Sequence, residues 1–152
     1  MRYCLDTSAL VGAWVRAYPI DVFPGLWAAL DDLANRGTIV CPEEVREELS
    51  RKSDDLYAWV RERSGMVVPL DGDQMDGTRE VLAAFPRLVG ALAERNRADP
   101  FVIALARARG LTVVTEERGG TPERPRIPLV CAHFGVRSIG TLDFIRELGV
   151  RF

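Results

Sequence analysis

Residues 98–117 read ADPFVIALARARGLTVVTEE, and this stretch decides the fold class. Asp99 and Pro100 are typical of a helix start, and residues 101–109 predict a helix, apolar nearly all round at first, that Gly110 terminates. Residues 111–114 then predict an apolar strand. A buried helix that leads directly into a buried strand is typical of an α/β protein.

The same alternation extends outward from this stretch in both directions. Further strands are predicted at residues 2–5, 38–41, 66–68 and 136–139. Further helices are predicted at residues 8–17, 25–36, 42–52, 54–63, 71–92 (with an interruption near Pro86) and 141–148, and a glycine- and proline-rich loop at 118–128. Strands that alternate with helices predict an α/β fold whose central sheet is mainly parallel and covered on both faces.

Length and composition indicate one domain. The chain has 152 residues, of which 47% are hydrophobic, so we expect residues 1–152 to form a single domain around one core. No stretch approaches a membrane span, and Asp6 interrupts the apolar run that a secretory signal would need. The three cysteines are scattered and contain no C-x-x-C pair, which is typical of reduced thiols. We therefore expect a cytoplasmic protein without a membrane contact.

The charge balance excludes indiscriminate binding of nucleic acid. The 20 basic and 22 acidic residues give a formal net charge of −2, so any contact with nucleic acid must come from a local patch. The single histidine, His133, leaves almost nothing for zinc chemistry or a serine–histidine relay, and we interpret it as structural. The three tryptophans occupy helical positions, where we interpret them as core residues: Trp14, Trp27 and Trp59.

Acidic residues gather where the predicted parallel strands end. Asp6 ends the first strand, Glu116 and Glu117 follow the strand at 111–114, and Asp99 starts the helix before that strand. Ligands of an open parallel sheet bind outside the carboxyl ends of its strands. Carboxylates that converge there repel one another unless a hard cation with oxygen ligands lies between them. The set therefore predicts a site for Mg²⁺ or Mn²⁺.

A fourth carboxylate comes from the glutamate-rich helix after the second strand. Val45 and Leu49 are four residues apart and define its buried side. At about 100° per residue, Glu48 lies about 60° from Val45, at the margin of the apolar stripe. Glu44 lies about 100° from Val45 and Glu47 lies nearly opposite. Glu48 is therefore the candidate, Glu44 the alternative, and Glu47 should face solvent.

Each acidic residue also has a purely structural interpretation. Asp6 before Thr7 and Ser8 is typical of a helix cap, and N-capping is the interpretation that we favour for Asp99 taken alone. A run of glutamates such as that at 43–48 is typical of a solvated helix face. The convergence of several carboxylates on one sheet edge is what favours the metal site.

Four motifs, taken in order along the chain, resemble those of the PIN-domain nucleases, especially the compact VapC-like toxins of bacterial and archaeal toxin–antitoxin pairs. They are YCLDTSAL (3–10), PEEVREEL (42–49), ADPFVIALA (98–106) and VVTEE (113–117). Residues 127–131 and the C-terminal strand and helix resemble one poorly characterised branch of this superfamily. The resemblance implies a three-layer α/β/α sandwich around a mainly parallel sheet.

The resemblance also implies the members of an active site. It matches four residues to the family's acidic positions: Asp6, Glu48, Asp99 and Glu117. Asp6 and Asp99 would be the principal ligands of Mg²⁺ or Mn²⁺, Glu48 would bind the ion through water or orient the nucleophile, and Glu117 would lie in the outer shell. Two residues would support the site by hydrogen-bonding a carboxylate or a phosphate oxygen: Ser8 and Thr115. Glu117 stands where the family usually has aspartate.

The implied activity is metal-dependent cleavage of single-stranded RNA by an endoribonuclease. Family members are commonly dimeric toxins that a small antitoxin protein inhibits, so we expect a homodimer and an antitoxin partner. Three arginines of the predicted loop are candidates for RNA phosphate contacts, and ordinary solvated loop charge is an equal interpretation of them: Arg118, Arg124 and Arg126.

Other classes that begin with a strand and an aspartate lack their required partners here. A haloacid-dehalogenase-type phosphatase needs a second aspartate where the chain has Ser8, and both it and a receiver domain need a suitably placed lysine, whereas the only lysine is Lys52. The first strand is not followed by G-x-G-x-x-G, which excludes a dinucleotide site of that type. The remaining alternative is a catalytically inactive PIN-like module that binds RNA or a protein.

Overall fold

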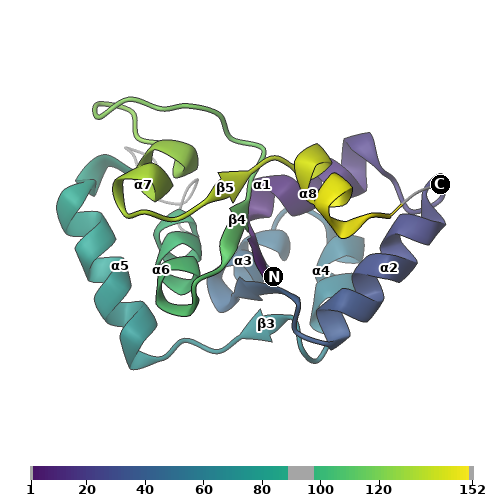
Figure 1. Cartoon of the computed structure of the whole chain (residues 1–152). Coiled ribbons are helices and arrows are strands. Elements are labelled where there is room, and N and C mark those ends of the chain that lie inside the picture. Colours follow the sequence, from purple (N-terminus) through teal and green to yellow (C-terminus); the bar gives the residue numbers. More distant parts are fainter. Residues whose placement is uncertain (1, 89–97, 151–152) are drawn as a thin grey trace.

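The protein is built around a central sheet of five parallel strands, seen in a computed structural model that describes residues 2–88 and 98–150 (Figure 1). The order across the sheet is β3-β2-β1-β4-β5. The strands are β1 (Tyr3–Leu5), β2 (Ile39–Pro42), β3 (Val67–Val68), β4 (Thr112–Val114) and β5 (Ser138–Ile139). All the pairings are parallel, as the sequence predicts, and β1 pairs with both β2 and β4 at the centre.

Helices cover both faces of this sheet, which gives the predicted three-layer α/β/α arrangement (Figure 1). On one face lie α5 (Gly72–Ala84), α6 (Asp99–Arg109) and α7 (Ile127–His133); on the other lie α1 (Thr7–Val11), α2 (Pro24–Asn35), α4 (Asp54–Arg61) and α8 (Thr141–Leu148). The remaining elements are the π-helical turn η1 (Gly12–Ala17), helix α3 (Glu43–Leu49) and the 3₁₀ turn η2 (Pro86–Leu88). Within the described residues, none of the helices has the length and apolar character needed to cross a bilayer.

The central strand is buried because its side chains alternate between two helical layers. Cys4 faces α6, where its Sγ lies 3.8 Å from the carbonyl oxygen of Val102. Tyr3 faces α8, and its ring packs edge-on against Phe144 at 4.9 Å between centroids. A strand covered on both sides needs apolar residues on both, which is why YCL carries no polar alternation.

The three tryptophans pack against one another on the face of the sheet that α2 and α4 cover, and two of them are buried as predicted. Trp27 lies edge-on to Trp14 at 4.8 Å and to Trp59 at 5.1 Å. Trp27 and Trp59 are buried and Trp14 is half-buried. The cluster ties η1, α2 and α4 together beside the sheet.

The structure differs from the predicted elements in three places. The predicted helix at 8–17 is split into α1 and a π-helical turn, and the predicted helix at 42–52 ends at Leu49. The predicted loop at 118–128 ends early, because α7 begins at Ile127 and uses Pro128 in its first turn. The last part of the helix predicted at 71–92 lies outside the described residues.

Candidate metal centre

Asp6 lies at the carboxyl end of the central strand and is 1% exposed. One carboxylate oxygen accepts a hydrogen bond from the backbone N–H of Ala9 at 2.8 Å and so caps α1. The Thr115 hydroxyl donates to the other oxygen at 2.7 Å, and the Ser8 hydroxyl also donates to this carboxylate at 2.9 Å. Asp6 is thus both a helix cap and a residue of the sheet edge, and its orientation is fixed from three sides.

Asp99 is the first residue of α6, and its predicted role as N-cap is wrong. The cap position belongs to Ala98, whose backbone is already helical (φ −80°, ψ −22°), and Asp99 makes no capping hydrogen bond. Its side chain is buried, with 8% exposed, and its Oδ2 has no hydrogen-bond partner in the part of the chain that the structure describes. A buried, unpartnered carboxylate oxygen needs a hydrogen-bond donor or a cation to offset the cost of its burial.

Glu117 completes a group of three carboxylates with Asp6 and Asp99. Each offers one oxygen, and these oxygens lie within 4.8 Å of one another. Glu117 is half-buried, and its backbone N–H donates to the Thr115 hydroxyl at 3.0 Å, so Thr115 joins two members of the group. Within the described residues, no lysine or arginine forms an ion pair with any of the three.

The pKa values of these carboxyl groups show the electrostatic strain of the arrangement. Burial raises the pKa of Asp6 from 3.8 to about 7, against the hydrogen bonds from Ala9, Thr115 and Ser8. Burial, followed by the nearby charges of Glu117 and Asp6, raises the pKa of Asp99 well above its ordinary value. A bound divalent cation reverses both effects. The oxygen-only ligand set and the unpartnered Oδ2 of Asp99 therefore fit Mg²⁺ or Mn²⁺.

Glu48 lies beside this group and lines the same cleft. It is 4% exposed, and the Thr7 hydroxyl donates to its Oε1 at 2.6 Å. Burial raises its pKa, while the hydrogen bond from Thr7 and the charge of Lys52 act in the opposite direction. Glu48 does not belong to the group of three carboxylates whose oxygens lie within 4.8 Å of one another, so it lies farther from the centre of the group than Asp6 and Asp99 do.

The other glutamates of α3 lie where the helical angles place them. The side chain of Glu47 is 63% exposed and has Arg46 at 3.5 Å. Glu44 is half-buried and does not line the cleft, although its Oε1 lacks a hydrogen-bond partner among the described residues. The structure thus turns Glu48, and not Glu44, toward the carboxylate group.

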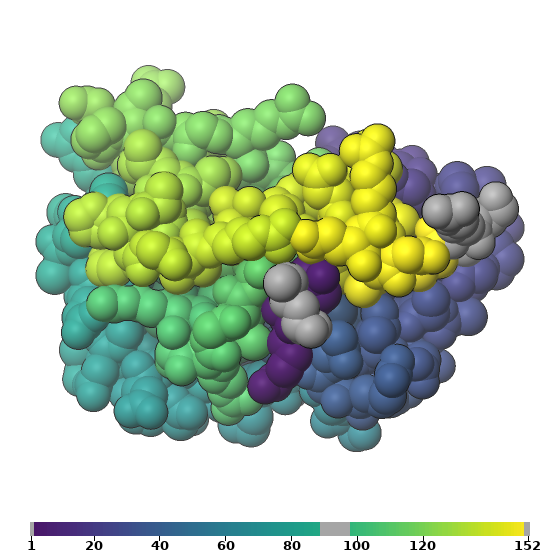
Figure 2. Space-filling view, in the orientation of Figure 1, coloured from purple at the N-terminus to yellow at the C-terminus, as the bar shows by residue number. Residues whose placement is uncertain are grey.

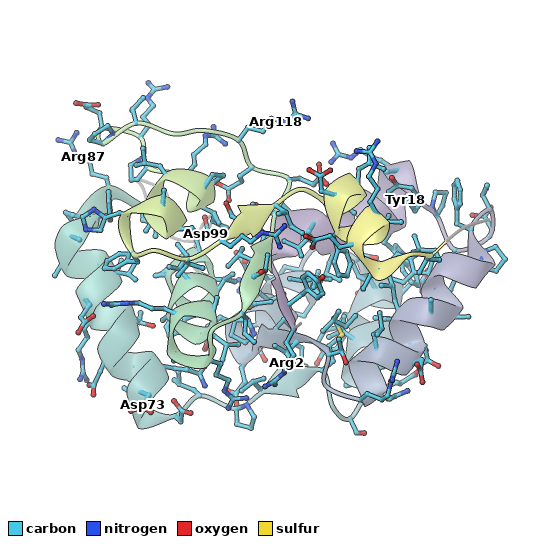
Figure 3. The ribbon with its side chains drawn as sticks, viewed as in Figure 1. Arg2, Tyr18, Asp73, Arg87, Asp99 and Arg118 are labelled. Carbon is cyan, nitrogen blue, oxygen red and sulfur yellow. The ribbon has the colours of Figure 1, made fainter. Side chains whose placement is uncertain are left out.

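The cleft around the carboxylates has a volume of about 1100 Å³ and a cationic rim. Of the three arginines predicted to contact RNA, Arg124 and Arg126 line it. Arg118 does not; it lines two neighbouring cavities, and Figure 3 shows it at the upper edge of the molecule. Sequence analysis missed three cations of the rim: Arg16, Lys52 and Arg87.

The sequence held a signal for only some of these missed cations. Lys52 lies four positions after Glu48 in the helix predicted at 42–52, a spacing that puts two residues on one helix face, although the structure ends α3 at Leu49. Arg16 follows the first strand in the turn that continues α1, on the same side of the sheet edge as Asp6. Arg87 reaches the cleft from η2 through tertiary packing alone. His133 packs edge-on against Phe85 and Phe134 and does not line the cleft, which agrees with a structural role.

Comparison with known proteins identifies the fold. The profile of a family described as a domain of unknown function (DUF4411) matches residues 3–152. No curated protein matches the sequence. Among solved structures, the chain is similar to VapBC2 from Rickettsia felis bound to a DNA fragment from their promoter, with 16% identity and a TM-score of 0.56 over 92% of this chain and 98% of that chain. The chain therefore has a VapC-like PIN fold, as its four motifs predict.

Proposed function

Because the chain belongs to the DUF4411 family, whose description assigns no activity, we propose from its carboxylate centre that it is a nuclease that uses Mg²⁺ or Mn²⁺ to hydrolyse phosphodiester bonds within single-stranded RNA. The observation that carries the proposal is the convergence of Asp6, Asp99 and Glu117, whose ligand oxygens lie within 4.8 Å of one another, with one buried oxygen of Asp99 that has no partner among the described residues. A divalent cation at such a centre activates water and neutralises charge that develops on a phosphate.

The residues of the centre have different roles in this proposal. Asp6 is held rigidly by Thr115, Ser8 and the N-terminus of α1, which suits a ligand that must keep its geometry. Asp99 contributes the free oxygen. Glu48, which the Thr7 hydroxyl holds at the side of the group, would orient the attacking water or hold the cation through a water molecule.

The VapC-like fold supports the biological part of the proposal. We propose that the chain acts in the cytoplasm as the toxin of a toxin–antitoxin pair, that it binds a small antitoxin protein, and that it forms a homodimer. The large open cleft with a cationic rim gives the substrate strand a route past the carboxylates.

The test compares cleavage of several single-stranded RNAs by the wild type and by Asp99→Asn, each with Mn²⁺. Asp99→Asn keeps the shape of the side chain and removes the charge, so cleavage should fall by about 10²-fold or more while circular dichroism shows an intact fold. Glu47→Gln, on the solvent side of α3, removes the same charge and should cleave like the wild type. Wild-type protein that binds RNA or a partner protein and leaves every RNA uncut would instead identify an inactive PIN-like binding module.

A further inference from the structure

The basic side chains on the rim of the cleft have no acidic ion-pair partner among the described residues. Within the described residues, none of the five has a carboxylate within ion-pair distance, and all five are exposed: Arg16, Lys52, Arg87, Arg124 and Arg126. Of the twelve other arginines that the structure describes, eight have such a carboxylate and four do not; the eight are Arg36, Arg46, Arg63, Arg79, Arg107, Arg109, Arg137 and Arg146. The rim therefore offers cations whose hydrogen-bond donors are available to a ligand.

Two of these cations, Arg124 and Arg126, come from a loop whose backbone is held by close packing and by its own hydrogen bonds. Gly120 has φ +109°, and a Cβ atom there would lie 2.7 Å from the backbone nitrogen of Arg126, so the two ends of the loop pass in contact. Thr121 and Arg124 exchange backbone hydrogen bonds of 3.1 Å, and the Thr121 hydroxyl accepts a further one from the Arg124 N–H. Pro125, between the two arginines, is buried.

This loop stands above the carboxylate centre. It runs from the end of β4 to α7 and forms the ridge along the upper edge of the molecule, while Asp99 lies below it (Figures 2 and 3). Arg124 and Arg126 line the cleft together with Asp6, Asp99 and Glu117. The loop thus places two guanidinium groups on the same cavity as the carboxylates, from a backbone that its own contacts hold in place.

The charges of the cleft indicate what these arginines bind. Five acidic residues line it, and all but one belong to the carboxylate group or to Glu48; the fifth is the exposed Glu123. Five basic residues balance them, so a divalent cation at the centre makes the whole cleft positive. Arginine forks match phosphate oxygens in geometry and charge.

We propose that the loop of residues 118–126 is a preformed phosphate clamp, in which Arg124 and Arg126 hold backbone phosphates of the substrate strand beside the phosphate at the carboxylate centre. The clamp rests on the proposed nuclease function and specifies its substrate class: a strand of several nucleotides gripped through its backbone, not a dinucleotide. Contacts to phosphate carry no sequence information, so the clamp fixes the strand's position without selecting its bases.

The first experiment measures binding without cleavage. Fluorescence anisotropy with a labelled oligouridylate of 12 nucleotides in EDTA gives Kd over a series of salt concentrations. Arg124→Gln and Arg126→Gln should each weaken binding by about fivefold or more and reduce the slope of log Kd against log salt by about 0.7. Arg79→Gln removes an equally positive charge on α5, outside the cleft, and should leave the slope unchanged. Unchanged affinity and slope in both loop variants would overturn the clamp.

A second pair of variants tests whether the loop is preformed. Gly120→Ala keeps every arginine and forces the backbone at Arg126 to move, so RNA binding should weaken by about the same factor as in the arginine variants. Gly119→Ala is the matched control, since its φ is also positive (+65°) and nothing lies within 4 Å of the added carbon. Equal RNA binding by Gly120→Ala and Gly119→Ala, with both variants folded, would show that the backbone closure does not position the arginines.

Cleavage assays separate failure of the clamp from failure of the nuclease proposal. With Mn²⁺, the loop variants should raise KM for the 12-mer with kcat nearly unchanged, and the wild type should cleave a dinucleotide poorly. Wild-type protein that shows the salt slope but cuts no RNA would overturn the nuclease proposal and leave the clamp. Wild-type protein that cuts RNA while the loop variants keep its KM would overturn the clamp alone. A 12-nucleotide DNA strand should bind with a similar slope, because the clamp contacts phosphates.

Discussion

Asp99 is buried beside two other carboxylates, so its negative charge opposes folding whenever no cation is bound. The raised pKa of Asp6, about 7, adds to this effect. A carboxyl group whose pKa is higher in the folded than in the unfolded state gives its full stability below about pH 4 and loses it as the pH rises through the folded pKa. The metal-free protein should therefore lose stability between about pH 4 and pH 7 through Asp6, and the loss should continue above pH 7 through Asp99, whose pKa is raised to about 10.

Thermal melting in EDTA between pH 5 and pH 8 measures this loss. The melting temperature should fall as the pH rises, and a saturating concentration of Mn²⁺ should remove most of the fall. Asp99→Asn should melt higher than the wild type at pH 8 without metal and should respond weakly to Mn²⁺. A wild-type melting temperature that changes neither with pH nor with added Mn²⁺ would contradict a cation site at these carboxylates.

A second prediction about single residues concerns two glutamates of α3, the buried Glu48 and the half-buried Glu44. Glu48→Gln can still accept the hydrogen bond from Thr7, so the fold should persist while cleavage falls by about tenfold or more. Glu44→Gln should retain most of the activity, because Glu44 does not line the cleft. The measurement is the rate of RNA cleavage by each variant with Mn²⁺. A larger loss in Glu44→Gln than in Glu48→Gln would show that Glu44 is the glutamate of α3 that acts in the site.

For single residues, the sequence predicts the orientation of a side chain where that orientation follows from helix geometry alone. The angle between Val45 and Glu48 follows from the rise and turn of any α-helix, and the structure buries both residues. The capping prediction for Asp99 failed because it depends on the backbone of Ala98, which is already helical. No local pattern distinguishes a cap from the first helical residue at that position.

Adjacent glutamates after β4 serve different elements. The Oε1 of Glu116 accepts a hydrogen bond from the backbone N–H of Thr141 at 3.2 Å, at the start of α8, whose cap residue Gly140 has no side chain to do so. Glu116→Ala should therefore lower the free energy of unfolding by about 1 kcal/mol and leave cleavage near the wild-type rate. Glu117→Gln should lower the rate of cleavage without lowering the free energy of unfolding. Urea denaturation and RNA cleavage of the two variants test this division; loss of activity in both would refute it.

Among the elements, those with strong periodic patterns were predicted well. Helix α8 has the predicted bounds, and α6 ends at Gly110 in a left-handed conformation as expected. Helix α7 was missed because Pro128 was counted with the prolines of the preceding loop, although a proline is also favoured in the first turn of a helix. The distinction rests on the packing of α7 against α6 and β5, which the local sequence does not carry.

For the molecule as a whole, the C-terminal helix closes the layer that covers the first strand. Phe144 is 2% exposed and packs against Tyr3, whose hydroxyl donates to Glu147 at 3.1 Å. Phe144→Ala should lower the free energy of unfolding by about 3–5 kcal/mol, because it leaves a cavity beside the central strand. Phe144→Leu, measured alongside by urea denaturation, should lose less than half as much. Equal stability of Phe144→Ala and the wild type would show that this layer does not support the sheet.

The order of the acidic residues along the chain has a consequence for the moment during synthesis at which the proposed centre can form. The four acidic residues are 6, 48, 99 and 117, and β4, which carries the last of them into place, pairs directly with β1. The last carboxylate is therefore synthesised 111 residues after the first, and β4 must also leave the ribosomal exit tunnel before it can pair with β1. A nascent chain that still lacks Glu117 holds no complete centre, so under the proposed nuclease function it would leave the RNA that encodes it uncut.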